Sequence, residues 1–125
     1  LAFRTGTWPA VWAGTILGLL NLVSDAYVIH PVQLLLEYPV PFAVLGLAGE
    51  FKSHPIWGMT VAGALRLVVH VLAGVIFWGS YAPEGQNVWI YSIGYNATYL
   101  VPQLILSILV MLILMRSSLW SHGRK

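Results

Sequence analysis

Charged residues are so scarce in this chain that they cannot cover the surface of a water-soluble globule. Of its 125 residues, six are Lys or Arg and four are Asp or Glu, which is 8% of the sequence, whereas 58% are hydrophobic. A soluble domain is typically about 25% charged and about 45–50% apolar. The composition therefore predicts a protein that lies in a lipid bilayer.

Four apolar segments have the length that a helix needs to cross a bilayer, which is about 20 residues. They are separated by short polar or proline-containing stretches and extend over Thr5–Ser24, Val32–Phe51, Trp57–Trp78 and Tyr91–Met115. We therefore expect an all-α fold, a polytopic membrane bundle of four transmembrane helices. We expect it to form a single domain over residues 1–125.

Two sequence details predict how these helices pack. Gly14 and Gly18 form a small-xxx-small pattern that lets helices approach closely, although such a pattern also arises by chance in a glycine-rich segment. Pro39 and Pro41 remove two backbone donors, so we expect a kink or a short unwound turn after Glu37. Irregular backbone at membrane depth is tolerated only against protein or a water-filled cavity.

The basic residues outside the spans predict the orientation in the membrane. Four spans place both termini on one side, and that side receives the basic residues Arg4, Lys52, Arg116, Arg124 and Lys125. The opposite loops hold Asp25 and Glu84 and no Lys or Arg. Since cytoplasmic loops carry the excess of Lys and Arg, both termini are predicted to be cytoplasmic. The scattered basic residues form no patch, so no nucleic-acid partner is expected.

An acid and a base lie inside these apolar segments. They are Glu37 and Arg66, and His70 follows Arg66 by one helical turn. Such groups are costly in hydrocarbon and usually pair or face a cavity. Because residues four apart share a helix face, one stripe of the third segment carries Arg66, His70, Gly74 and Trp78. On this stripe Gly74 leaves a gap in which a flat ring could lie.

Aromatic and amide side chains accompany this group. Tyr38, Trp78 and Tyr91 lie near the ends of the same segments, and Asn96 shares a face of the fourth segment with Tyr99 and Gln103. Tyr91 joins that face only if the helix begins irregularly. An acid, a base and several aromatic rings at one end of a bundle predict a site for something polar, flat or cationic.

Each of these residues also has a plainer interpretation. Arg66 could form a structural ion pair with Glu37, and this need not exclude a site nearby. His70 could be a packed core residue. Trp78, Trp89 and Tyr91 could belong to the belt of aromatic residues that lies at membrane interfaces, and for Trp89 this is the preferred interpretation.

The sequence contains no motif that is typical of an enzyme. It has no Gly-rich phosphate loop, no His-Glu-x-x-His and no nucleophile elbow. It has no Cys, and its four dispersed His do not predict a metal site. We expect neither catalysis nor a cofactor. Two other classes stay open: a membrane enzyme with Glu37 and His70 as its acid–base pair, and a purely structural membrane subunit.

Three stretches of the sequence resemble one known family. They are Leu36-Glu37-Tyr38, Leu45-Gly46-Leu47-Ala48-Gly49, and the segment from His70 to Ala82 with its Phe77-Trp78 pair. Over most of its length the chain resembles the thiamine-specific S-component, of the ThiT type, of energy-coupling-factor (ECF) transporters. Family members have six spans, so the resemblance implies that the first two helices of a longer parent are absent here.

The resemblance implies a multi-pass protein of the bacterial plasma membrane that binds thiamine near its outer face. Such a protein serves ATP-driven vitamin uptake together with a transmembrane coupling protein and two ATPase subunits. The ligand-binding positions of the family correspond here to Tyr27, Glu37, Tyr38, His70, Trp78, Tyr91 and Asn96. A related carrier for another vitamin or a pyrimidine precursor is the nearest alternative. The chemistry agrees, because thiamine pairs a permanently cationic thiazolium with an aminopyrimidine.

Overall fold

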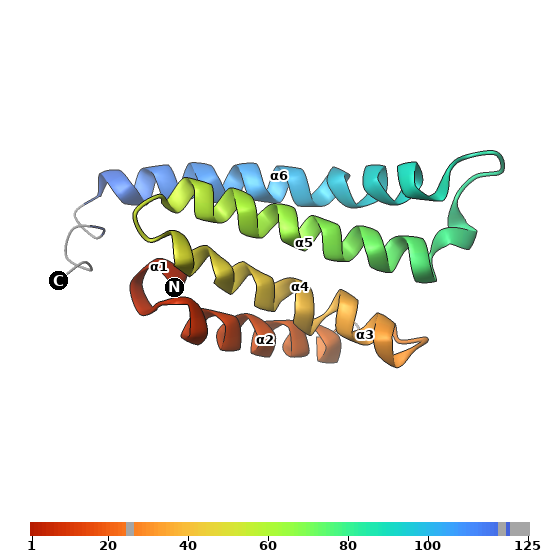
Figure 1. Cartoon of the computed structure of the whole chain (residues 1–125), viewed down its shortest axis with the longest axis horizontal. Helices are drawn as coiled ribbons and strands as arrows, with labels where there is room; N and C mark the ends of the chain where they lie inside the picture. The colour runs from red at the N-terminus through yellow and green to blue at the C-terminus, as the bar shows by residue number, and fades with distance from the viewer. Residues whose placement is uncertain (25–26, 118–119, 121–125) are drawn as a thin grey trace.

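The computed structural model describes residues 1–24, 27–117 and 120, and over these residues it is helical with short connections (Figure 1). The α-helices and the two 3₁₀ helices, η1 and η2, are in chain order α1 (Ala2–Thr5), α2 (Thr7–Ser24), α3 (Pro31–Glu37), α4 (Pro39–Ala43), η1 (Val44–Phe51), α5 (Pro55–Phe77), η2 (Gly79–Tyr81) and α6 (Val88–Arg116).

Four helical stretches within the described residues are long and apolar enough to cross a membrane, namely Thr7–Ser24, Pro31–Phe51, Pro55–Phe77 and Val88–Arg116. The predicted all-α membrane bundle is therefore confirmed. The last helix begins three residues earlier than expected, because the Asn87 side chain caps it. Its Oδ1 accepts hydrogen bonds from the N–H groups of Trp89 and Ile90, at 2.9 and 3.4 Å.

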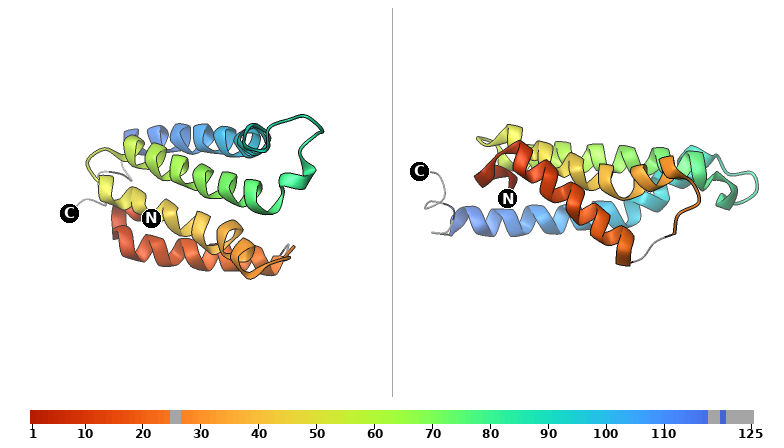
Figure 2. Two further views of the ribbon diagram at one scale, coloured as in Figure 1. Left: turned by 45° about the vertical axis from the view of Figure 1, so that its right-hand side comes forward. Right: turned by 90° about the horizontal axis from the view of Figure 1, so that it is seen from below.

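Each span packs against the span that follows it in the chain (Figure 1, and Figure 2, left). α2 packs on α4 and η1, η1 packs on α5, and α5 packs on α6. Leu1 and the end of α6 lie at one end of the bundle, while α3, η2 and the turn into α6 lie at the other. This arrangement agrees with an even number of crossings.

Glycines of α2 allow it to lie directly on the second span. A Cβ atom at Gly14 would collide with the carbonyl group of Phe42, and one at Gly18 would collide with the carbonyl oxygen of Tyr38. The small-xxx-small pattern is therefore used for close packing, as predicted. In a membrane such packing supplies van der Waals contact where no hydrophobic driving force between helices exists.

The second span is not one regular helix. Tyr38, with φ −112° and ψ −81°, separates α3 from α4, and from Val44 onward the backbone tightens into the 3₁₀ helix η1. Pro39 and Pro41 cannot donate backbone hydrogen bonds, which explains why the interruption falls here. The predicted kink is confirmed, and it leaves Glu37 at the C-terminal end of α3.

Candidate functional site

A cavity of about 740 Å³ lies among the spans toward the end of the bundle that carries α3 and η2. All eight residues proposed from the sequence as ligand contacts line it, and so does Arg66. Six further lining residues were not singled out as ligand contacts; they are Asn21, Phe42, Tyr81, Ser92, Tyr95 and Tyr99. The structure thus brings the candidate residues of three different spans to one place.

Glu37 presents the acidic group of this cavity. Its carboxylate accepts a hydrogen bond from the side-chain amide of Gln33 and another from the indole N–H of Trp78. Hydrogen bonds to a charged acceptor are roughly twice as strong as neutral ones. Two donors therefore hold the carboxylate in place, and neither of them cancels its charge.

Arg66 is not the ion-pair partner of Glu37, which corrects the structural alternative for these two residues. The Arg66 Nη1 donates a hydrogen bond to Oε1 of Gln103 at 3.2 Å, and the guanidinium carbon lies 4.6 Å from the ring centroid of Phe42. The guanidinium is thus held by an amide of α6 and a ring of α4. Its charge lies apart from the hydrogen bonds of Glu37.

Trp78 forms the centre of an aromatic wall. Its ring centroid lies 5.6 Å from that of Tyr27 and 5.8 Å from that of Tyr81. The hydrogen bond from its indole to Glu37 directs the side chain toward the cavity rather than toward a membrane interface. Trp78 directly follows the last residue of α5 as its C-cap, so the carboxylate and the wall come from two different spans.

A second row of rings follows α6. Ring centroids are 6.2 Å apart for Tyr91 and Tyr95, 6.1 Å for Tyr95 and Tyr99, and 6.1 Å for Tyr99 and His70. The spacing of four residues between the tyrosines could have identified Tyr95 and Tyr99 from the sequence. That pattern becomes clear once α6 is known to begin before Tyr91, at the cap that Asn87 provides.

Asn96 is buried between α5 and α6, with 5% of its surface exposed. Its Nδ2 donates to the carbonyl oxygen of Ser92 at 2.9 Å, and its Oδ1 accepts from the hydroxyl of Tyr99 at 2.6 Å. Ser92 in turn donates its hydroxyl to the carbonyl oxygen of Val71 at 2.8 Å. The bond from Ser92 to Val71 joins α6 to α5, and Nδ2 of Asn96 also lies 3.4 Å from the carbonyl oxygen of His70, so polar contacts fix the two helices together at the wall of the cavity.

The space beside Gly74 belongs to a neighbouring helix, which corrects the expectation of an open gap there. Gly74 lines the cavity, but a Cβ atom on it would collide with Oγ of Ser92 and would lie 3.3 Å from Nδ2 of Asn96. The absence of a side chain lets α6 approach α5. A substitution at this position therefore changes the packing of α5 on α6 before it changes ligand binding.

We expect Gly74→Ala to lower the free energy of unfolding by about 1–3 kcal/mol, because the added methyl group overpacks the contact between the helices. Thermal unfolding in detergent would measure the effect. Gly94→Ala is the matched control, since a Cβ atom at Gly94 would meet nothing within 4 Å. Equal melting temperatures for the two variants would contradict the packing role of Gly74.

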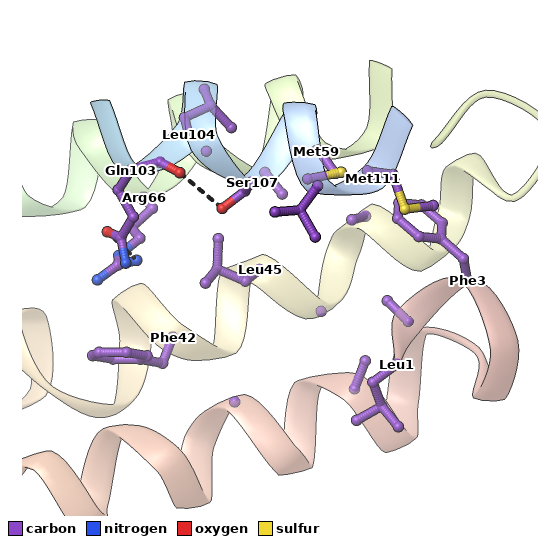
Figure 3. A pocket seen from close by; sticks show the side chains of 18 of the residues that line it. Leu1, Phe3, Phe42, Leu45, Met59, Arg66, Gln103, Leu104, Ser107 and Met111 are labelled. Atoms are coloured by element: carbon purple, nitrogen blue, oxygen red, sulfur yellow. Dashed lines mark hydrogen bonds between the residues drawn. The ribbon is translucent and has the colours of Figure 1, made fainter. Parts of the chain in front are cut away.

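A second, apolar cavity of about 670 Å³ lies toward the end of the bundle that carries Leu1. Figure 3 shows Phe42, Arg66 and Gln103 at one end of it and Phe3 at the other. We call the first cavity, which Glu37 lines, the polar cavity. Because Phe42 and Arg66 line both cavities, the guanidinium lies at the boundary between the polar cavity and the apolar one.

The polar cavity offers no metal site, since the described part of the chain holds no cluster of three His, Cys, Asp or Glu residues that could bind a metal ion. Its lining carries the carboxylate of Glu37, the guanidinium of Arg66, the imidazole of His70, several aromatic rings and a few hydroxyl and amide groups. Such a lining can bind a small molecule that carries a charge and aromatic rings.

Four spans around such a cavity define a multi-pass membrane protein that can hold a small molecule within its bundle. Residues 1–121 match the model of the family described as thiamine transporter protein (Thia_YuaJ), and the chain belongs to this family. The family expected from the sequence is thereby confirmed.

Two curated relatives, both named thiamine transporter ThiT, agree with this assignment. The one from Bacillus subtilis is 36% identical over 131 residues, which cover 91% of this chain and 68% of the relative. The one from Lacticaseibacillus paracasei is 33% identical over 135 residues, which cover 92% and 67%. Both are named transporters, so the expectation that the chain is not an enzyme is confirmed.

A solved structure of ThiT from Listeria monocytogenes has the same fold. It superposes with a TM-score of 0.83 at 30% sequence identity, and the match covers 94% of this chain and 73% of that one. The arrangement of the four spans is therefore shared with a member of the ThiT group.

Proposed function

We propose that the polar cavity binds thiamine and that the chain is the substrate-binding membrane subunit of an ECF transporter. The observation that carries the proposal is the Glu37 carboxylate, which two neutral donors orient and which has no ion-pair partner among the residues that the structure describes. A charge in such a setting favours a cationic ligand, because isolated charges in a membrane are costly.

The aromatic walls supply the second requirement of a thiamine site. A cation that lies over an aromatic face gains about 2 kcal/mol or more when it is desolvated. Trp78 and Tyr27 place such faces beside Glu37, so a thiazolium can meet a ring and a carboxylate together. His70, Tyr38, Tyr91 and Asn96 line the rest of the cavity and can contact the neutral aminopyrimidine.

The volume of the cavity also suits a ligand of two rings. Small-molecule sites usually have volumes of about 300–1,000 Å³ and combine apolar walls with a few placed polar groups. The cavity of about 740 Å³ falls within this range. It leaves room for both rings of thiamine.

Isothermal titration of the purified chain in nanodiscs tests the proposal. We expect thiamine to bind, whereas riboflavin and biotin, which lack a cationic ring, should bind much more weakly. Titration with the free aminopyrimidine half of thiamine distinguishes this proposal from its main alternative, a carrier for a pyrimidine precursor. If that neutral half bound as tightly as thiamine, the role of Glu37 as the partner of a cation would be refuted.

We propose that both termini are cytoplasmic and that the polar cavity faces the outside of a bacterial plasma membrane. Because the chain has no native Cys, single cysteines report the topology directly. Glu84→Cys in intact cells should react with an impermeant maleimide, whereas Lys52→Cys should react only after the cells are opened. The reverse labelling pattern would show that the protein has the opposite orientation in the membrane.

We propose, finally, that a transmembrane coupling protein and two ATPases join this subunit for uptake. The excess of basic residues at the end with the termini, and an outward-facing cavity, agree with energy supplied from the cytoplasm. Co-expression with the coupling protein and ATPases of the same organism, followed by affinity purification, is the test. Recovery of the chain alone would oppose the assembly.

A further inference from the structure

Gln33 is a polar side chain that the fold buries completely. Its exposed fraction is 0%, and it lies in α3 one helical turn before Glu37. A buried amide is costly unless its polar atoms are hydrogen-bonded. Its hydrogen bonds therefore indicate what the fold requires of it.

The amide of Gln33 makes three hydrogen bonds to two parts of the chain. Its Oε1 accepts from the backbone N–H of Ile29 at 3.2 Å. Its Nε2 donates to the carbonyl oxygen of Tyr27 at 3.0 Å and to the carboxylate of Glu37. These bonds determine which way the amide points, because a reversed amide would set oxygen against two acceptors and N–H against an N–H.

These bonds close a ring of contacts around the edge of the cavity. Gln33 holds Tyr27, the ring of Tyr27 packs on Trp78 at 5.6 Å, Trp78 donates to Glu37, and Glu37 accepts from Gln33. Tyr27 is 61% exposed, so polar and ring contacts rather than burial hold it in place, and these include a hydrogen bond from its backbone N–H to the hydroxyl of Tyr38 at 3.2 Å. The four residues thus form one closed set of contacts.

We infer that Gln33 is a positioning residue that couples the orientation of Glu37 to the placement of residues 27–29 at the edge of the cavity. The inference rests on the proposed function insofar as Glu37 binds the cation. Gln33 itself lies behind the carboxylate and is not among the residues that line the cavity, so it acts through Glu37 and Tyr27.

Amide hydrogen exchange of the full chain in nanodiscs, without ligand, tests the coupling. In Gln33→Met the amide of Ile29 loses its acceptor and should exchange about ten-fold faster. In Glu37→Leu, Gln33 stays in place but loses one partner, and the Ile29 amide should also exchange several-fold faster. Gln86→Met, in the exposed loop at the same end, should leave the Ile29 rate unchanged.

Thiamine affinity supplies the second measurement. Gln33→Met should weaken binding about ten-fold, which corresponds to about 1.4 kcal/mol. In the Glu37→Leu background the same change should have a clearly smaller effect, since only the part that Gln33 exerts through Tyr27 then remains. A residue that only packs the fold would instead lower the affinity by the same factor in both backgrounds.

The two measurements separate failure of this inference from failure of the proposed function. If the unmodified chain does not bind thiamine, the proposed function fails, while the exchange of the Ile29 amide still decides the coupling. If thiamine binds but Glu37→Leu leaves the Ile29 rate unchanged, the coupling is overturned. The exchange rate of the Ile29 amide in Glu37→Leu can be measured even if Gln33→Met does not accumulate as folded protein.

Discussion

Replacing Glu37 by Gln is expected to weaken thiamine binding by about 1–3 kcal/mol, which is roughly five- to 150-fold in the dissociation constant. The substitution keeps the shape and one acceptor oxygen, so either Trp78 or Gln33 loses its acceptor, and it removes the negative charge that faces the cavity. A cationic ring then enters a site without its counter-charge, and in a low-dielectric setting that loss is large.

Titration calorimetry of the two proteins measures this effect, with Glu84→Gln as the control. Glu84 is an exposed acid in the loop before α6, so its charge should contribute little. Because Arg66 bonds Gln103 and not Glu37, Arg66→Met is not expected to restore what Glu37→Gln loses. An unchanged affinity in Glu37→Gln would remove this residue from the site.

Trp78→Leu is expected to weaken thiamine binding by about 2–4 kcal/mol, because it removes both the central aromatic face and a donor to Glu37. The loss should exceed that of either neighbouring ring, since the Trp78 ring packs on both Tyr27 and Tyr81. Thiamine should also quench less tryptophan fluorescence in this variant than in the unmodified chain.

The matched control for Trp78 is Trp89→Leu. Trp89 lies in the first turn of α6, is 50% exposed and is not among the residues that line the cavity. Its loss should leave the affinity close to that of the unmodified chain. If Trp78→Leu bound thiamine as well as Trp89→Leu does, the aromatic wall beside Glu37 would play no part in binding.

Local properties of the sequence determined the spans, the interruption and the candidate residues. A run of about 20 apolar residues predicts a helical span, because backbone groups in lipid must find their hydrogen-bond partners within the chain. Pro39 and Pro41 lack backbone N–H groups in any fold, so the break after Glu37 follows from the positions of these prolines in the sequence. Polar groups in apolar segments are rare, which is why Glu37, His70 and Asn96 could be singled out.

Only the tertiary structure decided which of these groups meet. Glu37 bonds Trp78, 41 positions further along the chain, and not Arg66, which was the partner suggested by charge. The gap at Gly74 is filled by Ser92 of the next helix. Helical periodicity determines which residues share a face, but the rotation and separation of neighbouring helices come from side-chain packing between spans, and these determine the partner of each polar group.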